Sequence, residues 1–459
     1  MTHAADTSPN VPQFVLAAAD DLRRMMRGSV LLPGDAAYAA ARQVWNGATD
    51  CRPALFALCQ TVEDVQAAVR VARSHGLPLS VRGGGHDWAG RALRENGLVI
   101  DLSKMRKVDV DSHAQVATVQ GGATAEDLIT AAAPRDLVAV VGSFGGVGMA
   151  GLTLGGGYGA LSSRYGLALD NMLGAKVVLA DGRLVNANDS ENAELFWALR
   201  GGGGNFGVVT SMRIRLHRIQ RMLAGAILFP WSEAEPVLRG YAEVVGSAVD
   251  ELGVTAGLLS CGDGEPVLFL APCWSGEPSE GERIINELQV LGSPFLTQVG
   301  PMAYGDLLRI YDAHIIDGRH YAVQNRWVSA LTPPIISALV AGGNNRTSPF
   351  SSIVLHHFRG APTRVPVHAT AFGLRQKHFL IEMIAAWEPG DDSAAHCQWG
   401  RDLSRALAPA ALPGGYPNLL GPDEPERVAQ AYGGNMGRLL EAKRRFDPDC
   451  VFSAIPLQG

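Results

Sequence analysis

The chain of 459 residues has few charged side chains and no basic excess. Charged residues make up 18% of the sequence and the formal net charge is −6, which excludes the composition of a nucleic-acid-binding or anionic-membrane-binding surface. Residues 1–12 are polar and lack the apolar segment of a signal peptide, and no other apolar run of spanning length is free of glycine. We therefore expect a cytoplasmic protein, a monomer or homodimer, without nucleic-acid or membrane partners.

Cysteine is also scarce, and its spacing suggests no metal or redox site. The six cysteines are Cys51, Cys59, Cys261, Cys273, Cys397 and Cys450. None of them forms a CxxC motif or stands at a metal-ligand spacing from a histidine. This pattern favours reduced thiols over a disulfide framework, and it predicts no metal centre.

What the sequence has in abundance is glycine, above all in the stretch Leu137–Asn171. From Leu137 to Ser163 there is no charged residue, and nine residues are glycine. Each glycine costs a helix about 1 kcal/mol relative to alanine, so this stretch is a poor membrane helix. Glycine instead allows positive φ angles and close approach of the backbone to a ligand, and successive N–H groups can bind anionic oxygens. The stretch therefore predicts a ligand site lined by backbone.

Two glycine clusters match the dinucleotide fingerprint GxGxxG. They are Gly146/Gly148/Gly151 and Gly202/Gly204/Gly207. A dinucleotide loop must follow a strand and open a helix. The first match runs on into three glycines, Gly155–Gly157, which we expect not to open a good helix. The second lies between a predicted helix and a predicted strand, which is the wrong order. An NAD site is therefore disfavoured.

The chain changes in character after about Met222, where the glycine clusters stop. We therefore predict three parts: residues 13–222, residues 223–409 and a C-terminal segment, 410–459, that returns to the first part. The first part mixes predicted helices (Asp35–Trp45, Thr61–Ser74, Ala125–Ala133, Glu191–Leu199), strands (Leu77–Val81, Gly97–Leu102, Val108–Val110, Gln115–Gln120, Gly207–Leu216) and a hairpin (Lys176–Leu179 with Leu184–Asn186). The second part has longer strand and helix units with proline-rich breaks, and the third has one predicted helix, Pro425–Arg445.

His86 stands out as a candidate ligand contact. It follows Gly83, Gly84 and Gly85 directly, so no neighbouring side chain would keep a planar ligand away from the imidazole. Arg82 at the head of this loop is a candidate phosphate or carbonyl partner. A lone histidine beside a strand is usually structural, but two glycine-rich clusters in one chain favour contact with a ligand here.

Four motifs stand in the order seen in one known family. They are VRGGGHDWAG (81–90), GGGYG with YGLALDN (155–159 and 165–171), FWALRGGGGNFG (196–207) and YPN (416–418). Through them the chain resembles the FAD-linked oxidases of the vanillyl-alcohol-oxidase type, in the berberine-bridge-enzyme-like branch. Within that branch it is similar to bacterial nicotine-oxidising members and to flavin oxygenases of polyketide tailoring.

The resemblance implies an α+β fold: a two-subdomain FAD-binding domain of the PCMH type and a substrate domain with an antiparallel sheet flanked by helices. It implies FAD bonded covalently to His86, with Gly83–Gly85 and Gly146–Gly148 around the pyrophosphate. The full set of residues expected at the cofactor is Arg82, Gly83, Gly84, Gly85, His86, Phe144, Gly146, Val147, Gly148, Gly151, Leu152, Asp170, Asn171, Asn205, Gly207, Val209, Tyr416 and Asn418. The tail Ser453–Pro456 departs from the family pattern, so no contact is carried over there.

Two residues are candidates for the proton acceptor that substrate oxidation requires. The resemblance implies Tyr416, although a phenol with a pKa near 10 needs a nearby cation or flavin to act as a base. The strand Ser352–Phe358 resembles the one on which relatives carry a catalytic glutamate, but it has no carboxylate. Alternation puts Val354, His356 and Phe358 on one face and Leu355 and His357 on the other, so one of the two histidines should face the flavin. We favour His356 as the second candidate. Further pocket candidates are Tyr158, His320, Tyr321 and Trp327.

Many relatives bond the flavin a second time, through a cysteine whose position is occupied here by Phe144. Phenylalanine has no nucleophilic atom, so a single link, at His86, is expected. Three functions remain open. The protein is an oxidase of a small alcohol, amine or natural-product intermediate that passes electrons to O₂ and forms H₂O₂, an oxygenase or cyclisation enzyme of secondary metabolism, or a flavin-holding protein without catalysis. The absent carboxylate keeps the third open.

Overall fold

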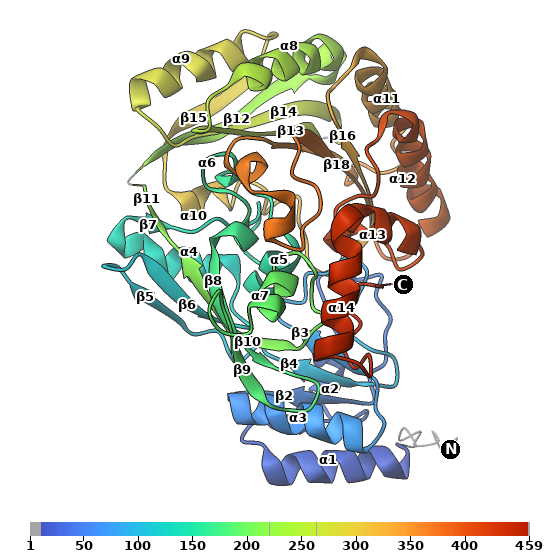
Figure 1. The fold of residues 1–459 in the computed structure, drawn as a ribbon. Coiled ribbons are helices and arrows are strands. Elements are labelled where there is room, and N and C mark those ends of the chain that lie inside the picture. The colour runs from blue at the N-terminus through green and yellow to red at the C-terminus, as the bar shows by residue number, and fades with distance from the viewer. Residues whose placement is uncertain (1–10, 220, 263, 458–459) are drawn as a thin grey trace, which may run out of the picture.

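The computed structural model describes residues 11–219, 221–262 and 264–457. The prediction that residues 1–12 form no signal peptide therefore falls almost wholly outside the described residues. Three sheets of four, five and seven strands lie one above another from the N-terminal end of the molecule to the opposite end (Figure 1).

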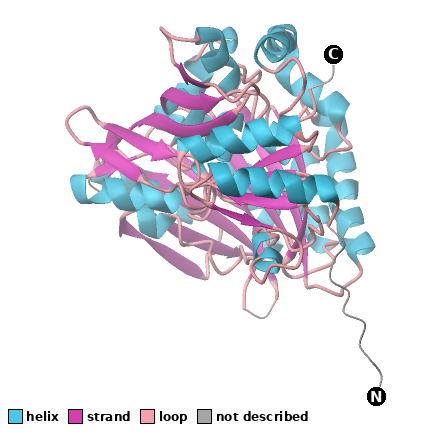
Figure 2. Cartoon of the chain, turned by 90° about the horizontal axis from the view of Figure 1, so that it is seen from below, coloured by secondary structure: helices cyan, strands magenta, loops and turns pink. Residues whose placement is uncertain are grey.

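The first sheet, near the N-terminus, has the strand order β1-β2-β4-β3. Its strands are β1 (Ser29–Leu31), β2 (Leu55–Leu58), β3 (Leu79–Arg82) and β4 (Leu98–Asp101), and the helices of this region are α1 (Gln13–Met25), α2 (Tyr38–Ala41) and α3 (Val62–Ser74). The strands β2, β3 and β4 are parallel. Seen from below, α1 and α3 lie side by side across the molecule (Figure 2). Helix α3 begins with a capping box between Thr61 and Asp64.

The second sheet has the order β5-β6-β10-β8-β9 and is antiparallel throughout. Its strands are β5 (Val108–Asp111), β6 (Val116–Gln120), β8 (Met172–Val178), β9 (Leu184–Ala187) and β10 (Val208–Arg215). The short strands β7 (Leu137–Val138) and β11 (His217–Arg218) pair with each other, and the helices here are α4 (Ala125–Ala132), α5 (Met149–Gly155), α6 (Ser162–Tyr165) and α7 (Ala193–Leu199).

The third sheet has seven antiparallel strands in the order β15-β12-β14-β13-β17-β18-β16. The strands are β12 (Met222–Pro230), β13 (Leu252–Ser260), β14 (Pro266–Trp274), β15 (Leu296–Met302), β16 (His320–Val328), β17 (Ser352–Phe358) and β18 (His378–Trp387). The helices α8 (Ala234–Ser247), α9 (Pro278–Gln289), α11 (Pro333–Asn344) and α12 (Ser393–Leu407) cover its outer face, and the short α10 (Tyr304–Leu307) lies toward the second sheet (Figure 1). The inner face is thereby left to meet the first two sheets.

The C-terminal segment runs back along the side of the molecule through α13 (Pro425–Tyr432) and α14 (Met436–Phe446) (Figure 1). Helix α14 packs against α7. The buried ammonium of Lys443 donates to the backbone oxygens of Asn205 and Phe452 and to the carboxylate of Asp447. These bonds hold the tail against the second sheet's loops.

The two antiparallel sheets, the larger of which has helices on its outer face, together with the mixed first sheet confirm the predicted α+β class. Two predicted helices are wrong in extent. Asp35–Trp45 forms only the four-residue α2, because the chain after it is held by contacts with other segments, including the bond from Trp45 N–H to Gly85 O. Pro425–Arg445 is two helices, since Gly433 adopts a φ of 50° between them.

The structure at the first GxGxxG match, Gly146/Gly148/Gly151, also differs from the expectation. Helix α5 begins at Met149, directly after Gly148, so this cluster does open a short helix. The strand before it, β7, pairs only with β11 and belongs to no parallel sheet. A dinucleotide loop needs a parallel βαβ unit, so the arrangement around this match still disfavours an NAD site.

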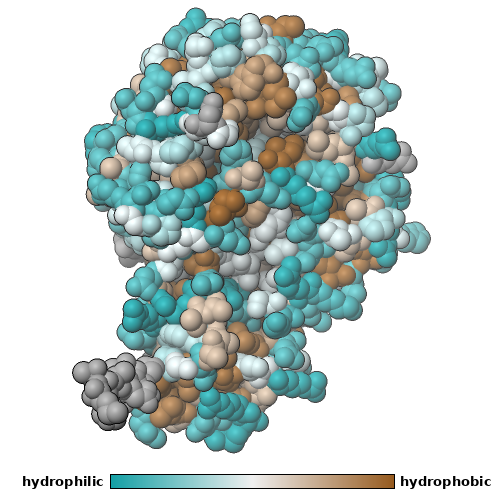
Figure 3. All heavy atoms as spheres, turned by 180° about the vertical axis from the view of Figure 1, so that it is seen from behind, coloured by the Kyte–Doolittle hydropathy of each residue, from teal (hydrophilic) through white to brown (hydrophobic). Residues whose placement is uncertain are grey.

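On the face seen from behind, hydrophobic side chains lie in patches between hydrophilic ones (Figure 3). None of the helices in the described residues combines the length and apolar character that a membrane crossing requires. The same part of the chain holds no cluster of His, Cys, Asp or Glu suited to a metal ion. Cys51, Cys59, Cys273, Cys397 and Cys450 are free of disulfide bonds.

Candidate active site

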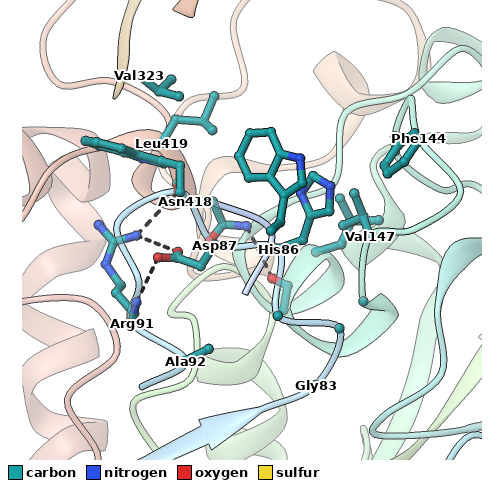
Figure 4. A pocket seen from close by; sticks show the side chains of 18 of the residues that line it. Gly83, His86, Asp87, Arg91, Ala92, Phe144, Val147, Val323, Asn418 and Leu419 are labelled. Atoms are coloured by element: carbon teal, nitrogen blue, oxygen red, sulfur yellow. Dashed lines mark hydrogen bonds and ion pairs between the residues drawn. The ribbon is translucent and has the colours of Figure 1, made fainter. Parts of the chain in front are cut away.

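One cavity of about 440 Å³ runs between the first two sheets and the inner face of the third. Its first half is lined by the loop after β3, the loop before α5, and the C-terminal tail. Its second half is lined by side chains from β13, β14, β16, β17 and β18. Residues more than 300 positions apart in the sequence therefore share one enclosure, and Figure 4 shows the first half at close range.

Two glycine loops meet backbone to backbone in the first half. A Cβ placed on Gly84 would lie 2.5 Å from the backbone nitrogen of Gly148, and a Cβ on Gly148 would lie 2.5 Å from the nitrogen of Gly84. Real Cβ atoms do not approach backbone that closely, so only glycine allows the two loops to come together. Gly83, Gly84, Gly85, Val147 and Gly148 all line the cavity. The result is a wall made of backbone atoms.

His86 lies at the end of this wall, and its imidazole is uncharged at neutral pH. Burial lowers the pKa of His86 to about 4, against 6.5 for an exposed histidine. Its Nε2 atom is buried and has no hydrogen-bond partner among the described residues. A buried ring nitrogen without a partner in a ligand cavity points to a partner that the protein itself does not supply.

A stack of three aromatic rings holds the imidazole in place. The Trp45 ring lies 4.4 Å from the His86 ring at an interplanar angle of 12°, and on its other face lies 4.0 Å from Tyr321 at 18°. The side chain of Asn46 bonds both the carbonyl and the N–H of Tyr321. The segment between α2 and β2 thus connects His86 to strand β16 of the third sheet.

The triple glycine Gly155–Gly157 packs against the C-terminal return. A Cβ on Gly155 would lie 2.1 Å from the Asn418 side chain, and one on Gly156 would lie 2.8 Å from the Tyr416 ring. The Tyr416 hydroxyl oxygen accepts hydrogen bonds from Gly157 N–H at 2.9 Å and from Asn418 Nδ2 at 3.2 Å. Burial nevertheless raises the pKa of Tyr416 well above its ordinary value, so the side chain is a neutral phenol.

A histidine and a carboxylate face the second half of the cavity together. His356 on β17 and Glu382 on β18 both line the cavity, with 3.3 Å between His356 Nε2 and the Glu382 carboxylate. The strands are paired so that Val354 stands opposite Glu382. His356 and Val354 share the inward face of β17, as the alternation predicted, and both line the cavity.

A second tyrosine, Tyr158, lies near Tyr416 and His356 and directly follows Gly157 in the chain. Tyr158 lines the cavity, and its ring lies 5.0 Å from the Tyr416 ring and 6.3 Å from the His356 ring. Its hydroxyl bonds Nε2 of His378, which is fully buried, at 2.9 Å. Burial lowers the pKa of His378 to about 3, so this imidazole is neutral.

Most of the residues selected from the sequence lie around this cavity. Those that line it are Gly83, Gly84, Gly85, His86, Phe144, Val147, Gly148, Gly151, Leu152, Gly207, Val209, His356, Tyr416 and Asn418, together with the pocket candidates Tyr158 and Tyr321. The Phe144 ring lies 5.3 Å from the His86 ring. Their exact contacts with a ligand stay predictions.

The remaining selected residues do not line the cavity. Arg82 pairs with buried Asp101 at 2.8 Å, and Asp170 forms a two-bond ion pair with Arg375. Asn171 donates to the carbonyls of Tyr165 and Leu167, and Asn205 accepts from Ile455 N–H. Each of these polar side chains supports a loop around the cavity. Gly146, His320 and Trp327 also lie off its surface.

The sequence reasoning missed several residues of the cavity wall. Glu382 is the most informative, because it is the only polar residue among the apolar residues 379–387 of the strand, and that isolation could be seen in the sequence. Ser453, Ala454 and Ile455 of the tail also line the cavity, although no contact was expected there. Trp45 had no such signal, since its position against His86 depends on folding.

Asp87, Arg91 and Asn418 form a polar group beside His86 (Figure 4). Arg91 bonds the Asp87 carboxylate at 2.9 Å and the backbone oxygen of Asn418 at 3.4 Å. This arrangement ties the C-terminal return to the loop that carries His86. Asp87 and Arg91 pair with each other, whereas Arg94, which also lines the cavity, bonds Ser453 and has a buried Nε without a partner among the described residues. The first half of the cavity therefore offers a ligand backbone N–H groups, one guanidinium and one neutral imidazole.

These features fit FAD. Backbone N–H groups of closely approaching glycines suit a pyrophosphate, and the buried, uncharged His86 stands where a flat ring system could reach it. The second half is enclosed by Val323, Val354 and Ile384 together with the His356–Glu382 pair. FAD in the first half would therefore place a redox ring next to a chamber that holds a titratable pair.

Comparison with known proteins supports this fit. Residues 53–188 match the FAD binding domain family, and residues 415–455 match the family described as berberine and berberine like. The chain is 30% identical to the FAD-linked oxidoreductase YvdP of Bacillus subtilis, covering 93% of this chain and 97% of that protein. It is 31% identical to (R)-6-hydroxynicotine oxidase of Paenarthrobacter nicotinovorans, covering 93% and 95%.

Comparison with solved structures leads to the same family. The 6-hydroxy-D-nicotine oxidase of Arthrobacter nicotinovorans superposes with a TM-score of 0.87 at 30% identity, covering 94% of this chain and 98% of that one. The berberine-bridge-enzyme-like protein 1 of Physcomitrella patens gives a TM-score of 0.89 at 22% identity over 96% and 99%, which shows the same fold. The predicted PCMH-type architecture and family are thus confirmed, and the chain is an FAD-dependent oxidoreductase that belongs to the berberine-bridge-enzyme-like branch of the vanillyl-alcohol-oxidase superfamily.

Proposed function

We propose that this enzyme is an oxidase that removes two electrons from a small organic substrate and passes them to O₂, giving H₂O₂, with FAD held by one covalent bond at His86. One observation carries the proposal: a backbone-lined cavity with the unpartnered Nε2 of His86 in one half opens onto the His356–Glu382 pair in the other. When bound, FAD supplies hydride acceptance and electron transfer to O₂. The protein must hold the substrate and take up its proton.

A single covalent bond is supported by the surroundings of His86. The imidazole is neutral, with Nε2 free to act as a nucleophile, and the Trp45 ring fixes the plane of the ring. Phe144 is the cavity residue at the position where relatives carry a cysteine, and no cysteine lines the cavity in the described residues. Mass spectrometry of peptides should place FAD on the His86 peptide, and acid should leave the colour on the protein.

The covalent bond has its own test. We expect His86→Ala protein to release its flavin into the acid supernatant, whereas Phe144→Leu should keep the flavin attached. A flavin that stays on the protein after His86→Ala, or free FAD from acid-treated wild-type protein, would contradict the assignment to His86.

For proton removal we favour the His356–Glu382 pair over Tyr416. The carboxylate beside His356 orients the imidazole and stabilises its charge once it takes up a proton. Tyr416 has two N–H donors but no adjacent cation, and its raised pKa opposes ionisation. Tyr416 as the base remains the alternative from the family resemblance. The carboxylate of Glu382 also counts against a flavin-holding protein without catalysis.

Stopped-flow measurement of flavin reduction separates the two assignments. General-base assistance is typically worth about 10²–10⁴-fold. We expect a loss of that size for His356→Ala and a much smaller one for Tyr416→Phe, with FAD retained in both. The reverse order would assign the base to Tyr416.

The choice of O₂ as acceptor is tested on a panel of small alcohols, amines and hydroxylated aromatic compounds. Substrate-reduced enzyme should be reoxidised by air with one H₂O₂ formed per substrate oxidised. Turnover that strictly requires NAD⁺ or a protein acceptor would overturn the oxidase proposal. Incorporation of ¹⁸O from ¹⁸O₂ into the product would instead assign the oxygenase function.

A further inference from the structure

Residues 308–319 connect α10 to β16 and contain turns but neither helix nor strand. We call this segment the connecting loop. His314 and Ile315 of the loop line the cavity, and the Tyr311 ring lies 6.0 Å from the ring of Phe269 on β14, another cavity residue. The loop therefore forms part of the wall of the second half of the cavity.

The end of the connecting loop is held by the side chain of Tyr321, the second residue of β16. The Tyr321 hydroxyl accepts a hydrogen bond from Ile316 N–H and donates one to Ile316 O, both at 2.9 Å. The backbone N–H and carbonyl of Tyr321 are in turn bonded by the Asn46 side chain. The position of Ile316 therefore depends on Tyr321.

Residues 45–47 are bonded to the same end of the loop. Gly318 N–H donates to Trp45 O, and Gly47 N–H donates to Arg319 O, each at 2.9 Å. A Cβ on Gly47 would lie 1.9 Å from the carbonyl oxygen of Gly318, so only glycine at position 47 allows this approach. The connecting loop is thus tied to a segment that lies far earlier in the chain.

Trp45 also reaches the loop that carries His86. Its N–H donates to Gly85 O at 3.0 Å, and its ring stacks between the rings of His86 and Tyr321. Gly85 and His86 line the part of the cavity that fits FAD. A ligand that restrains them would restrain Trp45 as well, because segments that satisfy each other's backbone groups open and close as one unit.

We infer that Tyr321 is a positioning residue that couples the two halves of the cavity, so that FAD in the first half orders the connecting loop in the wall of the second. The substrate half is then fully formed only in FAD-loaded protein. Such coupling is reciprocal: a change that disorders the loop should weaken FAD binding by the factor by which FAD protects the loop. The inference rests on the fit of FAD to the first half, and it is independent of the acceptor that takes the electrons.

Hydrogen exchange with and without FAD tests the coupling. His86→Ala protein lacks the proposed covalent bond, so FAD can be removed and added back, while the backbone bond from Trp45 N–H to Gly85 O is kept. Mass spectrometry of peptides from residues 308–319 measures their exchange rate. We expect saturating FAD to slow this exchange about 3–10-fold, as one neutral hydrogen bond allows, and to leave peptides of α8 on the outer face of the third sheet unchanged.

Tyr321→Phe in the same protein removes the bonds to Ile316 but keeps an aromatic ring against Trp45. Exchange in the connecting loop should become faster, and saturating FAD should then slow it less than about twofold. The dissociation constant of FAD, measured by quenching of its fluorescence, should rise about 3–10-fold. Tyr241→Phe, which removes a buried hydroxyl on α8 that bonds Val254 O, is the matched control and should change neither quantity.

Gly47→Ala breaks the same connection at the backbone, and we expect the same two changes. Gly305→Ala, on α10 just before the loop, is its control, since its Cβ would meet only the Ile129 side chain, at 3.8 Å.

The inference is overturned if FAD leaves exchange in residues 308–319 of the His86→Ala protein unchanged, or if the full FAD effect persists in Tyr321→Phe, which would mean direct contact between FAD and the loop. A purely structural role for Tyr321 would speed exchange equally with and without FAD and leave the affinity for FAD unchanged, and it would overturn the inference too. Absence of H₂O₂ formation with intact coupling would overturn the oxidase proposal alone, whereas oxidase activity without coupling would overturn only the role of Tyr321.

Discussion

The two halves of the cavity are lined by different parts of the chain, one by backbone and the other by side chains. The half that fits FAD is a wall of backbone, where Gly84 and Gly148 approach so closely that no Cβ would fit. The half that faces the substrate is a wall of side chains, projected by strands of the seven-stranded sheet and including His356 and Glu382. A cofactor with a constant pyrophosphate can be bound by backbone, whereas a substrate must be distinguished by side chains.

Because of this difference, the two halves should respond differently to substitutions. In the backbone wall a single added methyl group would displace a whole loop. The affinity for FAD and the free energy of unfolding should therefore decrease together. In the side-chain wall an isosteric substitution leaves the backbone in place, so the rate of flavin reduction should fall while FAD stays bound. Four changes test this contrast.

The largest effect should come from Glu382→Gln in the side-chain wall. Removing the charge beside His356 takes away the group that stabilises the protonated imidazole. We expect flavin reduction at saturating substrate to slow about 10²–10⁴-fold, with FAD content unchanged. Stopped flow measures the rate. Glu388→Gln, which alters an exposed carboxylate paired with Arg319, is the control and should keep the wild-type rate. A Glu382→Gln enzyme within threefold of wild type would contradict the role of the pair.

In the backbone wall, Gly84→Ala should lower both the free energy of unfolding and the FAD content. The new Cβ would lie 2.5 Å from the Gly148 nitrogen, and overpacking of this kind typically costs about 1–3 kcal/mol. Denaturant unfolding and the ratio of flavin to protein absorbance measure the two losses.

Gly246→Ala is the matched control, since its Cβ would meet nothing within 4 Å and α8 should gain up to about 1 kcal/mol. If Gly84→Ala protein were as stable and as yellow as wild type, the backbone wall would not depend on glycine at that position.

Acid should destabilise the side-chain wall through His378. Its pKa is about 3 in the folded protein and 6.5 when exposed, so the unfolded chain takes up the proton first as the pH falls. Stability is therefore complete above pH 6.5 and declines below it, by about 1.4 kcal/mol per pH unit for one such group. Between pH 7 and pH 5 the His378→Gln protein should lose about 1–2 kcal/mol less than wild type in urea unfolding. Equal losses in the two proteins would mean that His378 does not stay uncharged in the fold.

The smallest effect should arise at Trp45, where the halves are joined. Its ring stacks on His86 from one half and on Tyr321 from the other. Trp45→Phe keeps an aromatic face but reduces the overlap, and we expect a loss of about 0.5–1.5 kcal/mol in stability. The fraction of flavin that resists acid release should fall as well, because the imidazole is less well held. Trp231→Phe, at a site bonded to Asn344 outside the cavity, should leave that fraction unchanged.

The sequence by itself determined the backbone wall, because glycines at Gly83–Gly85 and Gly148 are a local requirement of that geometry and remain visible in the chain. It also determined local elements such as α3, whose Thr61 cap is a short-range signal. The motif resemblance added the α+β architecture and the family.

Only the tertiary structure decided the side-chain wall. Glu382 reaches His356 because β18 pairs with β17 in a register that no local pattern encodes. Trp45 was predicted in a helix, yet it stacks on a histidine 41 positions away along the chain. The same holds for Tyr158, whose hydroxyl bonds His378 across 220 residues of the chain. Contacts of that kind depend on strand register and domain packing, whereas a glycine requirement depends on the backbone at one residue.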